Sequence, residues 1–275
     1  MTSQITFIGG GNMAASLIGG LISNGQPADS IRVAEPDAER LQTLQHQYGV
    51  QVSTDNPSAV KAADLLVLAV KPQILQTVCR DLTGSVQQRR PLVISVAAGI
   101  RSADIERWLG GELAIVRCMP NTPALLQQGA TGLFANARVT DPQRTQAETI
   151  LQAAGITLWV NDETLIDTVT AVSGSGPAYF FLLMEQIQKA GEQLGLDTET
   201  ARRLTLQTAL GAARMASESD DDLASLRSKV TSKGGTTEAA INSFIEQGIE
   251  TMVNRALTAA RDRATELADL LGKDQ

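Results

Sequence analysis

A glycine-rich turn near the N-terminus carries the clearest chemical signal in this sequence. The segment Gly9-Gly10-Gly11-Asn12-Met13-Ala14 directly follows a short apolar run and opens an amphipathic stretch. In a G-x-G-x-x-A motif the first glycine permits a tight turn, the second lets a pyrophosphate approach the backbone, and the alanine allows close helix-strand packing. Phosphates would then meet free N–H groups at the start of a helix. We expect a dinucleotide site here, the alternative being a turn that only connects a strand to a helix.

Glu35 bears on which dinucleotide is bound. It ends the second apolar run, where a carboxylate can hydrogen-bond the adenosine ribose hydroxyls and would repel a 2′-phosphate. This position favours NADH over NADPH. Because Pro36 follows directly, a side chain that only faces solvent is the alternative, and the choice between the two cofactors stays open.

Two further strand ends should line the nicotinamide half of the cleft, because ligands of open α/β sheets bind at the carboxyl ends of the strands. These are Ala69-Val70-Lys71-Pro72 and Ala97-Ala98-Gly99. Lys71 is expected to contact the cofactor, although a lysine in this place is commonly only solvated. Asn56 is expected in a loop that could reach the adenosine ribose, the alternative being a plain Asn-Pro turn.

A proton donor of the usual kind is missing from the sequence. Hydroxy-acid dehydrogenases need an acid beside the forming alkoxide, most commonly histidine, and the chain contains one histidine, His46. Its neighbours are Gln and Glu on the adenosine side, which indicates an exposed surface residue. The nitrogen of an iminium substrate can arrive protonated, so that an imine fits the missing acid.

Two segments rich in small and hydroxyl residues could hold a substrate. Ser232-Lys233-Gly234-Gly235-Thr236-Thr237 leads into a predicted helix, so free N–H groups and hydroxyls would meet a carboxylate. Ser173-Gly174-Ser175-Gly176-Pro177-Ala178-Tyr179 also leads into a helix. The alternatives are a capping turn with Thr236 or Thr237 near the N-cap for the first, and a linker for the second.

The elements that must position these residues are indicated by short apolar runs alternating with amphipathic segments over residues 4–160. Five runs read as strands buried on both faces: Ile5–Gly9, Ile31–Glu35, Leu65–Val70, Leu92–Ala97 and Leu113–Met119. Two later runs, Thr131–Ala135 and Gly155–Val160, flank a helix with Asp141 as N-cap and Pro142 as its first residue, and should extend the same sheet. The predicted fold is α/β, a Rossmann-type, doubly wound, mostly parallel sheet over residues 1–160 followed by an all-α domain over residues 161–275.

The second domain is predicted from Ala-rich helical segments with no strand among them. Four helices are expected: Pro177 to about Leu194, ended by Gly195; one capped by Asp197 and reaching roughly Ser217; one opened by Gly234-Gly235; and Ile249–Leu271. A long amphipathic terminal helix in a short second domain often completes a partner subunit. We therefore expect a homodimer.

Composition restricts the classes of partner. A formal net charge of -7 without clustered Lys and Arg argues against nucleic acid or an anionic membrane, so the expected partner is a small molecule. The two cysteines, Cys79 and Cys118, form no disulfide or zinc pattern, which fits a reducing cytoplasm and no metal. Cys118 is interpreted as a buried thiol. No run approaches 18 uninterrupted apolar residues, so neither a signal peptide nor a membrane span is expected.

Five ordered motifs together resemble pyrroline-5-carboxylate reductase over nearly the whole chain. They are FIGGGNMA from Phe7, AVKP from Ala69, RCMPNTPA from Arg117, AVSGSGPAY from Ala171 and SKGGTT from Ser232. The resemblance implies that NADPH or NADH reduces 1-pyrroline-5-carboxylate to L-proline, the last step of proline synthesis. It also suggests dimers interlocked through the helical domain, sometimes assembled into a ring of five dimers.

The same resemblance implies roles for individual residues. Around the cofactor it places Asn12, Met13, Glu35, Asn56, Val70, Lys71 and Ala97, and at the substrate Glu163, Thr236 and Thr237. The Ser232 hydroxyl and backbone amides near Thr236 would hold the carboxylate, and the Thr237 hydroxyl would bond the ring nitrogen. Thr170 is expected close by as a second catalytic residue.

Three positions depart from the family pattern. Lys233 stands where proline usually precedes the two glycines, Glu35 where a small polar residue is more common, and Asp220-Asp221-Asp222 replaces a segment that generally contains proline. They bear on the turn geometry and the NADPH preference, and they remove no implied contact.

Two rival functions are considered. A 3-hydroxyacid dehydrogenase would need Lys189 or Lys229 as its acid, and a non-catalytic dinucleotide sensor would bind cofactor but no carboxylate. Consumption of NADPH or NADH in the presence of pyrroline-5-carboxylate discriminates among the three functions.

Overall fold

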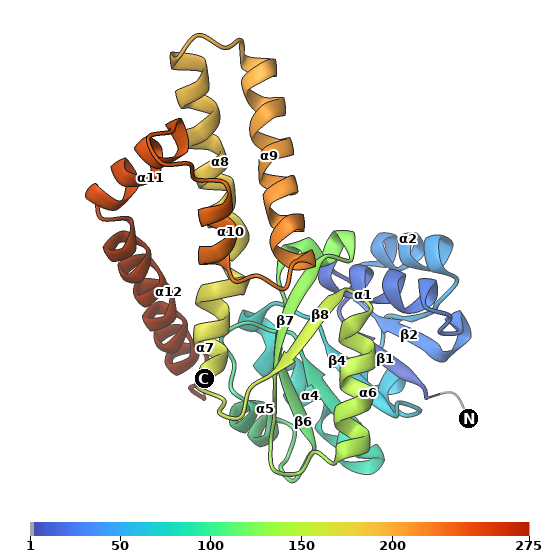
Figure 1. Ribbon diagram of the computed structural model, residues 1–275. Coiled ribbons are helices and arrows are strands. Elements are labelled where there is room, and N and C mark those ends of the chain that lie inside the picture. The colour runs from blue at the N-terminus through green and yellow to red at the C-terminus, as the bar shows by residue number, and fades with distance from the viewer. Residues whose placement is uncertain (1–2, 275) are drawn as a thin grey trace. The chain divides into compact units, whose positions relative to one another are not determined.

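A computed structural model describes residues 3–274 (Figure 1), which fall into two compact units. The first unit is Met1–Ser175 with Ala259–Gln275, and the second is Gly176–Thr258. The predicted boundary after residue 160 thus lies inside the first unit, and the C-terminal segment returns to that unit.

One eight-stranded sheet organises the first unit, in the order β3-β2-β1-β4-β5-β6-β7-β8. Its strands are β1 Ile5–Ile8, β2 Ile31–Ala34, β3 Gln51–Ser53, β4 Leu65–Leu68, β5 Leu92–Ser95, β6 Ile115–Met119, β7 Gly129–Ala135 and β8 Gly155–Trp159. All neighbouring strands are parallel except β6 and β7. The predicted doubly wound, mostly parallel sheet is confirmed, and β7 and β8 extend it as expected.

Both faces of the sheet are buried, which is why its strands are nearly continuous in apolar residues. Side chains alternate between the faces: Phe7 and Val67 belong to a core with α1 (Asn12–Ser23), α2 (Ala38–Tyr48) and α6 (Asp141–Gln152). Ile8 and Leu66 belong to a second core with α3 (Asn56–Val60), α4 (Pro72–Arg89) and α5 (Ser102–Trp108). Figure 1 shows α1 and α6 in front of the sheet.

The N-terminus of α6 differs by one residue from the predicted one. Thr140 is the N-cap, because its side chain and that of Gln143 form a capping box, and Asp141 is the first helical residue. Short elements complete the unit: η1 (Ala28–Ser30), η2 (Thr122–Leu126), α7 (Leu165–Val169) and the π-helical turn η3 (Thr170–Gly174).

The second unit is helical, and residues 176–258 contain no strand. Its helices are α8 (Gly176–Gln193), α9 (Thr198–Glu218), α10 (Leu223–Lys229), α11 (Thr236–Glu246) and the first part of α12 (Ile249–Leu271). Asp197 caps α9 as predicted, by accepting a hydrogen bond from the Thr200 N–H at 3.0 Å. The short helix α10 is not among the helices that the sequence pattern predicts. Among the helices of residues 3–274, none combines the length and the hydropathy of a membrane-spanning segment.

Hydrogen bonds and an ion pair hold the last part of α12 and the residues after it against α5. These contacts explain why the segment from Ala259 belongs to the first unit. Arg101 forms an ion pair with Asp269 at 2.6 Å, and Arg107 donates to the Gly272 carbonyl at 2.6 Å. The indole N–H of Trp108 donates to Asp274 at 3.1 Å. These contacts hold residues 269–274 against α5.

Candidate active site

The carboxyl ends of four strands meet at one edge of the sheet. Ile8 at the end of β1 pairs in register with Ala34 of β2 and with Leu68 of β4, and Leu68 pairs with Ser95 of β5. The residues that follow these strands therefore lie side by side. This set contains the predicted cofactor residues of the glycine-rich turn, Glu35, the AVKP segment and the Ala97–Gly99 turn.

Gly9 is required by the close approach of β1 and β4. Its φ of 97° is strained for any residue with a side chain, and a Cβ there would lie 2.7 Å from the Ala69 carbonyl oxygen. Its N–H donates to the Ala34 carbonyl at 2.8 Å. The first glycine of the motif therefore makes the tight turn, as expected.

The amino terminus of α1 has the features of an anion site. Gly11 is its N-cap, no side chain caps it, and its first turn holds no acidic residue. A Cβ on Gly11 would meet nothing within 4 Å, so open space lies beside the first N–H groups, those of Asn12 and Met13. Ala14 is fully buried behind them, which allows α1 to pack on β1. A helix terminus of this kind favours negative charge.

Glu35 lies against the glycine-rich turn and does not simply face solvent. Its Oε2 accepts from the Gly10 N–H at 2.8 Å, and its Oε1 accepts from the Asp37 N–H at 3.3 Å. The carboxylate is therefore fixed beside the glycine-rich turn, where it can still accept further hydrogen bonds.

The other predicted cofactor residues lie at helix starts and in one turn. Lys71 is the exposed N-cap of α4, Pro72 begins that helix, and Val70 is half-buried. Asn56 is not in a loop: it is the first residue of α3. Ala97 is buried and Ala98 exposed. Gly99 has a φ of 69°, and a Cβ there would lie 3.6 Å from the Leu267 Cβ of α12.

A buried ionic network around Arg117 lies in the first unit, and no pattern along the chain predicts it. Arg117 of β6, 2% exposed, contacts Glu163 at 3.3 Å and Asp167 of α7 at 3.2 Å. Glu163 also accepts from the N–H and the hydroxyl of Ser102, at 2.6 and 2.7 Å. Both of its oxygens are thus engaged within the protein. The Thr265 hydroxyl of α12 donates to Asp167 at 2.9 Å.

The segment Ser173–Tyr179 connects the two units, and it is helical, because it includes the end of the π-helical turn that begins at Thr170 and the start of α8. The Thr170 hydroxyl donates to the Ile166 carbonyl at 2.8 Å, and the Asn121 amide donates to the Ser173 carbonyl at 3.1 Å. The RCMPNTPA and AVSGSGPAY motifs therefore pack on each other through a π-helical turn, a feature often found at functional sites.

The predicted substrate turn lies in the second unit, at the start of α11. Gly235 is the N-cap, so Thr236 and Thr237 are the first two helical residues and neither caps the helix. Gly234 takes a φ of 74° and donates its N–H to Glu238 at 2.7 Å. Within residues 3–274 the hydroxyls of Ser232, Thr236 and Thr237 make no hydrogen bond. This uncapped terminus with unpaired hydroxyls can bind a carboxylate.

The acidic run Asp220–Asp222, which departs from the family pattern, stabilises the start of α10. Asp222 caps α10 by accepting from the Ser225 N–H at 2.7 Å, and these hydrogen bonds lower the pKa of its carboxyl. Asp221 forms an ion pair with Lys229. The other lysine of the dehydrogenase alternative, Lys189, pairs with Glu185. Neither lysine has the buried environment that a catalytic acid needs.

The remaining candidates for chemistry are inert. His46 is exposed at the end of α2. Burial raises the pKa of the Cys79 thiol to about 12, and it raises the pKa of the Cys118 thiol despite the nearby Arg117 charge. Both thiols therefore stay neutral and are not nucleophiles at neutral pH. Within residues 3–274 no group of three His, Cys, Asp or Glu could hold a metal ion.

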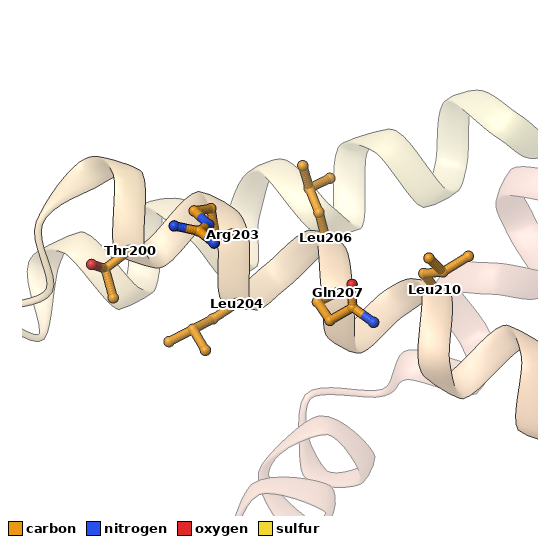
Figure 2. Close-up of a pocket in the computed structure, with 6 residues that line it drawn as sticks. All are labelled: Thr200, Arg203, Leu204, Leu206, Gln207 and Leu210. Carbon is orange, nitrogen blue, oxygen red and sulfur yellow. The ribbon is translucent and has the colours of Figure 1, made fainter.

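Two hollows in the second unit carry none of the motif residues. Figure 2 shows one of them, lined by Thr200, Arg203, Leu204, Leu206, Gln207 and Leu210, whose side chains project from α9 in different directions. The other is an apolar groove of about 930 Å³ between α8 and α9. Both lie on helix surfaces rich in exposed leucine.

Two family models match the chain. One, described as NADP oxidoreductase coenzyme F420-dependent, matches residues 4–99, and the other, pyrroline-5-carboxylate reductase dimerisation, matches residues 163–267. The pyrroline-5-carboxylate reductase of Pseudomonas aeruginosa is 55% identical over 272 residues, which are 99% of this chain and 99% of that protein.

Solved structures agree with these matches. A pyrroline-5-carboxylate reductase from Coxiella burnetii is 48% identical, with a TM-score of 0.94 over 98% of this chain and 99% of that one. The Plasmodium falciparum pyrroline carboxylate reductase with NADP bound is 27% identical, with a TM-score of 0.83 over 97% and 98% of the two chains.

Proposed function

The chain belongs to the pyrroline-5-carboxylate reductase family, and we propose how its residues carry out the family's reaction. In this reaction NADPH or NADH reduces the carbon-nitrogen double bond of 1-pyrroline-5-carboxylate and gives L-proline, the last step of proline biosynthesis. The observation that supports the proposed cofactor site most directly is the uncapped amino terminus of α1, with open space beside Gly11.

The first unit binds the dinucleotide. The N–H groups of Asn12 and Met13 receive the pyrophosphate, since they are the unpaired donors of an uncapped helix. Glu35 and Asn56 lie towards the adenosine ribose, and the strand ends from Ala69 to Pro72 and from Ala97 to Gly99 line the nicotinamide half. When bound, the reduced cofactor supplies the hydride.

The turn in the second unit binds the substrate. The carboxylate accepts from the Ser232 hydroxyl and from the backbone N–H groups near Thr236 that open α11. The Thr237 hydroxyl bonds the ring nitrogen and, where the imine arrives unprotonated, relays to it a proton taken up from solvent. A fixed near-attack geometry over nicotinamide C4 is worth up to about 7–11 kcal/mol, so the reaction needs no histidine acid.

Glu163 and Thr170 take supporting parts in this proposal. Glu163 holds the start of α5 through Ser102 and neutralises Arg117, so its substrate contact would use the lone pairs that these bonds leave free. The Thr170 hydroxyl donates to Ile166, which leaves its oxygen free to accept one hydrogen bond.

The protein oligomerises through the helical domain that the dimerisation model matches. We propose a homodimer, which can assemble further into a pentamer of dimers, and light scattering of the purified protein measures which of these forms. A cytoplasmic location is part of the proposal, because both cysteines are free and buried.

The test of the function is cofactor oxidation, followed as the fall in absorbance of NADPH or NADH when pyrroline-5-carboxylate is added. Formation of proline in equal amount is the expected result. Activity with a 3-hydroxyacid as substrate, together with no oxidation of the cofactor by the pyrroline, would contradict this function.

A further inference from the structure

Two side chains of opposite charge flank Gly10 in the nucleotide loop of the first unit. The Cβ of Glu35 and the Cδ of Arg40 each lie 3.5 Å from the position that a Cβ on Gly10 would take. Glu35 directly follows β2, and Arg40 is the third residue of α2. Both side chains therefore reach the adenosine side of the loop.

Within residues 3–274, Glu35 and Arg40 do not form an ion pair with each other. The Glu35 carboxylate accepts hydrogen bonds from the Gly10 and Asp37 N–H groups. Over residues 3–274 the Arg40 guanidinium makes no hydrogen bond or ion pair, and its backbone N–H donates to the Asp37 carboxylate. An exposed guanidinium beside Gly10, without a partner among the described residues, is available to an anion from outside the chain.

We propose that Arg40 binds the adenosine 2′-phosphate of NADPH, while Glu35 accepts from the ribose hydroxyls of NADH. The inference rests on the proposed cofactor site at Gly9–Met13. A planar guanidinium matches a phosphate in two parallel hydrogen bonds, whereas a carboxylate in this place binds hydroxyls and repels phosphate. Two N–H dipoles on Glu35 weaken that repulsion. The pair therefore admits both cofactors, and Arg40 sets the affinity for NADPH.

Calorimetric titration of the full chain tests this assignment without using turnover. The probes are NADPH, NADH, and the fragments adenosine 2′,5′-bisphosphate and adenosine 5′-monophosphate. Arg40→Gln should weaken binding of NADPH and of the bisphosphate by about 10- to 100-fold, as expected for charge-assisted hydrogen bonds. Binding of NADH and the monophosphate should change less than about twofold, because they lack the 2′-phosphate.

Further variants sharpen the test. Arg40→Lys should bind NADPH more tightly than Arg40→Gln and less tightly than the parent. Lysine keeps the positive charge but cannot donate two parallel hydrogen bonds to the phosphate. Glu35→Gln should strengthen NADPH binding and weaken NADH binding. The control is Lys61→Gln, which removes an exposed positive charge just before β4 begins, at the opposite edge of the sheet, and should leave all four affinities unchanged.

Two results would overturn the inference. If Arg40→Gln and Arg40→Lys leave NADPH binding at the parent level, or weaken NADPH and NADH equally, Arg40 does not bind the 2′-phosphate, although the cofactor site and the reaction stand. A parent protein that binds neither cofactor would overturn the cofactor site, and this inference with it.

Discussion

At the scale of single residues, the fold distinguishes hydroxyls that are occupied from hydroxyls that are free. The Thr170 hydroxyl donates to Ile166, whereas within residues 3–274 the Thr237 hydroxyl, half-buried at the start of α11, has no partner. Only a free hydroxyl can both accept a proton and donate one. Thr237 is therefore the stronger candidate for contact with the ring nitrogen.

Thr237→Ala tests this role. Loss of the hydroxyl should lower kcat by about 10- to 100-fold, the value of a hydrogen bond to a charged group. The dissociation constant of NADPH should stay within about twofold, since Thr237 lies outside the cofactor set. Steady-state kinetics and calorimetry measure the two quantities.

Two companion variants make the result specific. Thr237→Ser keeps a hydroxyl and should recover most of the turnover. Thr145→Ala removes an exposed hydroxyl that bonds only the Asp141 carbonyl in α6, and it should leave kcat unchanged. Turnover of Thr237→Ala equal to that of the parent would remove Thr237 from the mechanism.

The Cys79 thiol predicts an alkaline loss of stability. Its pKa is raised to about 12 by burial in the native state, whereas an unfolded cysteine titrates near 8.5. Above pH 9 the unfolded chain releases this proton first, so the free energy of unfolding should fall by up to about 1.4 kcal/mol per pH unit for this thiol. Below pH 8 the thiol contributes no pH dependence.

Urea unfolding of the parent and of Cys79→Ala at pH 8, 9 and 10 isolates this contribution. The variant should be less stable at pH 8, because a buried atom is lost, yet its stability should fall less steeply with pH. Parallel slopes for the two proteins would show that Cys79 is not protected from deprotonation.

At the scale of elements, the sequence was informative where one physical rule dominated. A strand covered on both faces must be apolar throughout, and this made β1, β2, β4, β5 and β6 predictable. The edge strand β3 was not predicted, because its three residues are too few to show an apolar pattern and the first of them, Gln51, is exposed. The short helix α10 is not predicted because a run of polar residues, Ser217–Asp222, directly precedes it, although Asp222 is its N-cap.

The candidate site was predictable to the extent that it is local. Gly9 and Gly11 act through their own backbone, so their spacing was enough. Arg40 and Arg117 act through residues brought near by tertiary structure, namely Gly10 for the first and Glu163 with Asp167 for the second. No pattern along the chain encodes those contacts.

The Arg117 network joins β6, α5, α7 and α12, so that its loss should lower the free energy of unfolding of the whole first unit. Arg117→Met leaves two carboxylates, those of Glu163 and Asp167, without their common partner. Removing one side of a buried ion pair costs about 3–5 kcal/mol, and urea unfolding should register a loss of this size. Arg117→Lys should cost less, since it keeps a charge.

The surface pair of Arg138 and Glu106 supplies the matched control. Its arginine side chain is 49% exposed, and exposed pairs contribute about 0–1 kcal/mol. Arg138→Met should therefore hardly change stability. Equal losses in Arg117→Met and Arg138→Met would mean that the buried network adds nothing to the fold.

At the scale of the whole molecule, the two units differ in how well they bury their own apolar residues. The first unit holds two extensive cores. In the second, the buried residues of α8 and α9 are Gly176, Ala201 and Thr205, and α10 and α11 bury none. A helical unit with so small a core must cover its apolar faces with another surface, and the dimerisation family to which this segment belongs indicates a second copy.

The apolar groove between α8 and α9 is the place to test this requirement. Leu183 of α8 is 48% exposed and Leu204 of α9 is 57% exposed, and both line the groove. In a two-fold interface a substitution acts on both subunits. Losing two buried leucine contacts should weaken the proposed dimer by at least about 3 kcal/mol, or more than about 100-fold in its dissociation constant. The desolvation of a new carboxylate adds to this loss.

Light scattering on size-separated samples of Leu204→Asp should therefore show a shift from the parent's oligomer towards the monomer. The unfolding temperature should fall and should depend on protein concentration, because association and stability are linked. The control is Gln186→Asp, which places the same charge at an exposed position of α8 that does not line the groove and should keep the parent's mass. A Leu204→Asp protein with the mass and stability of the parent would mean that the groove is covered by something other than a second copy of the chain.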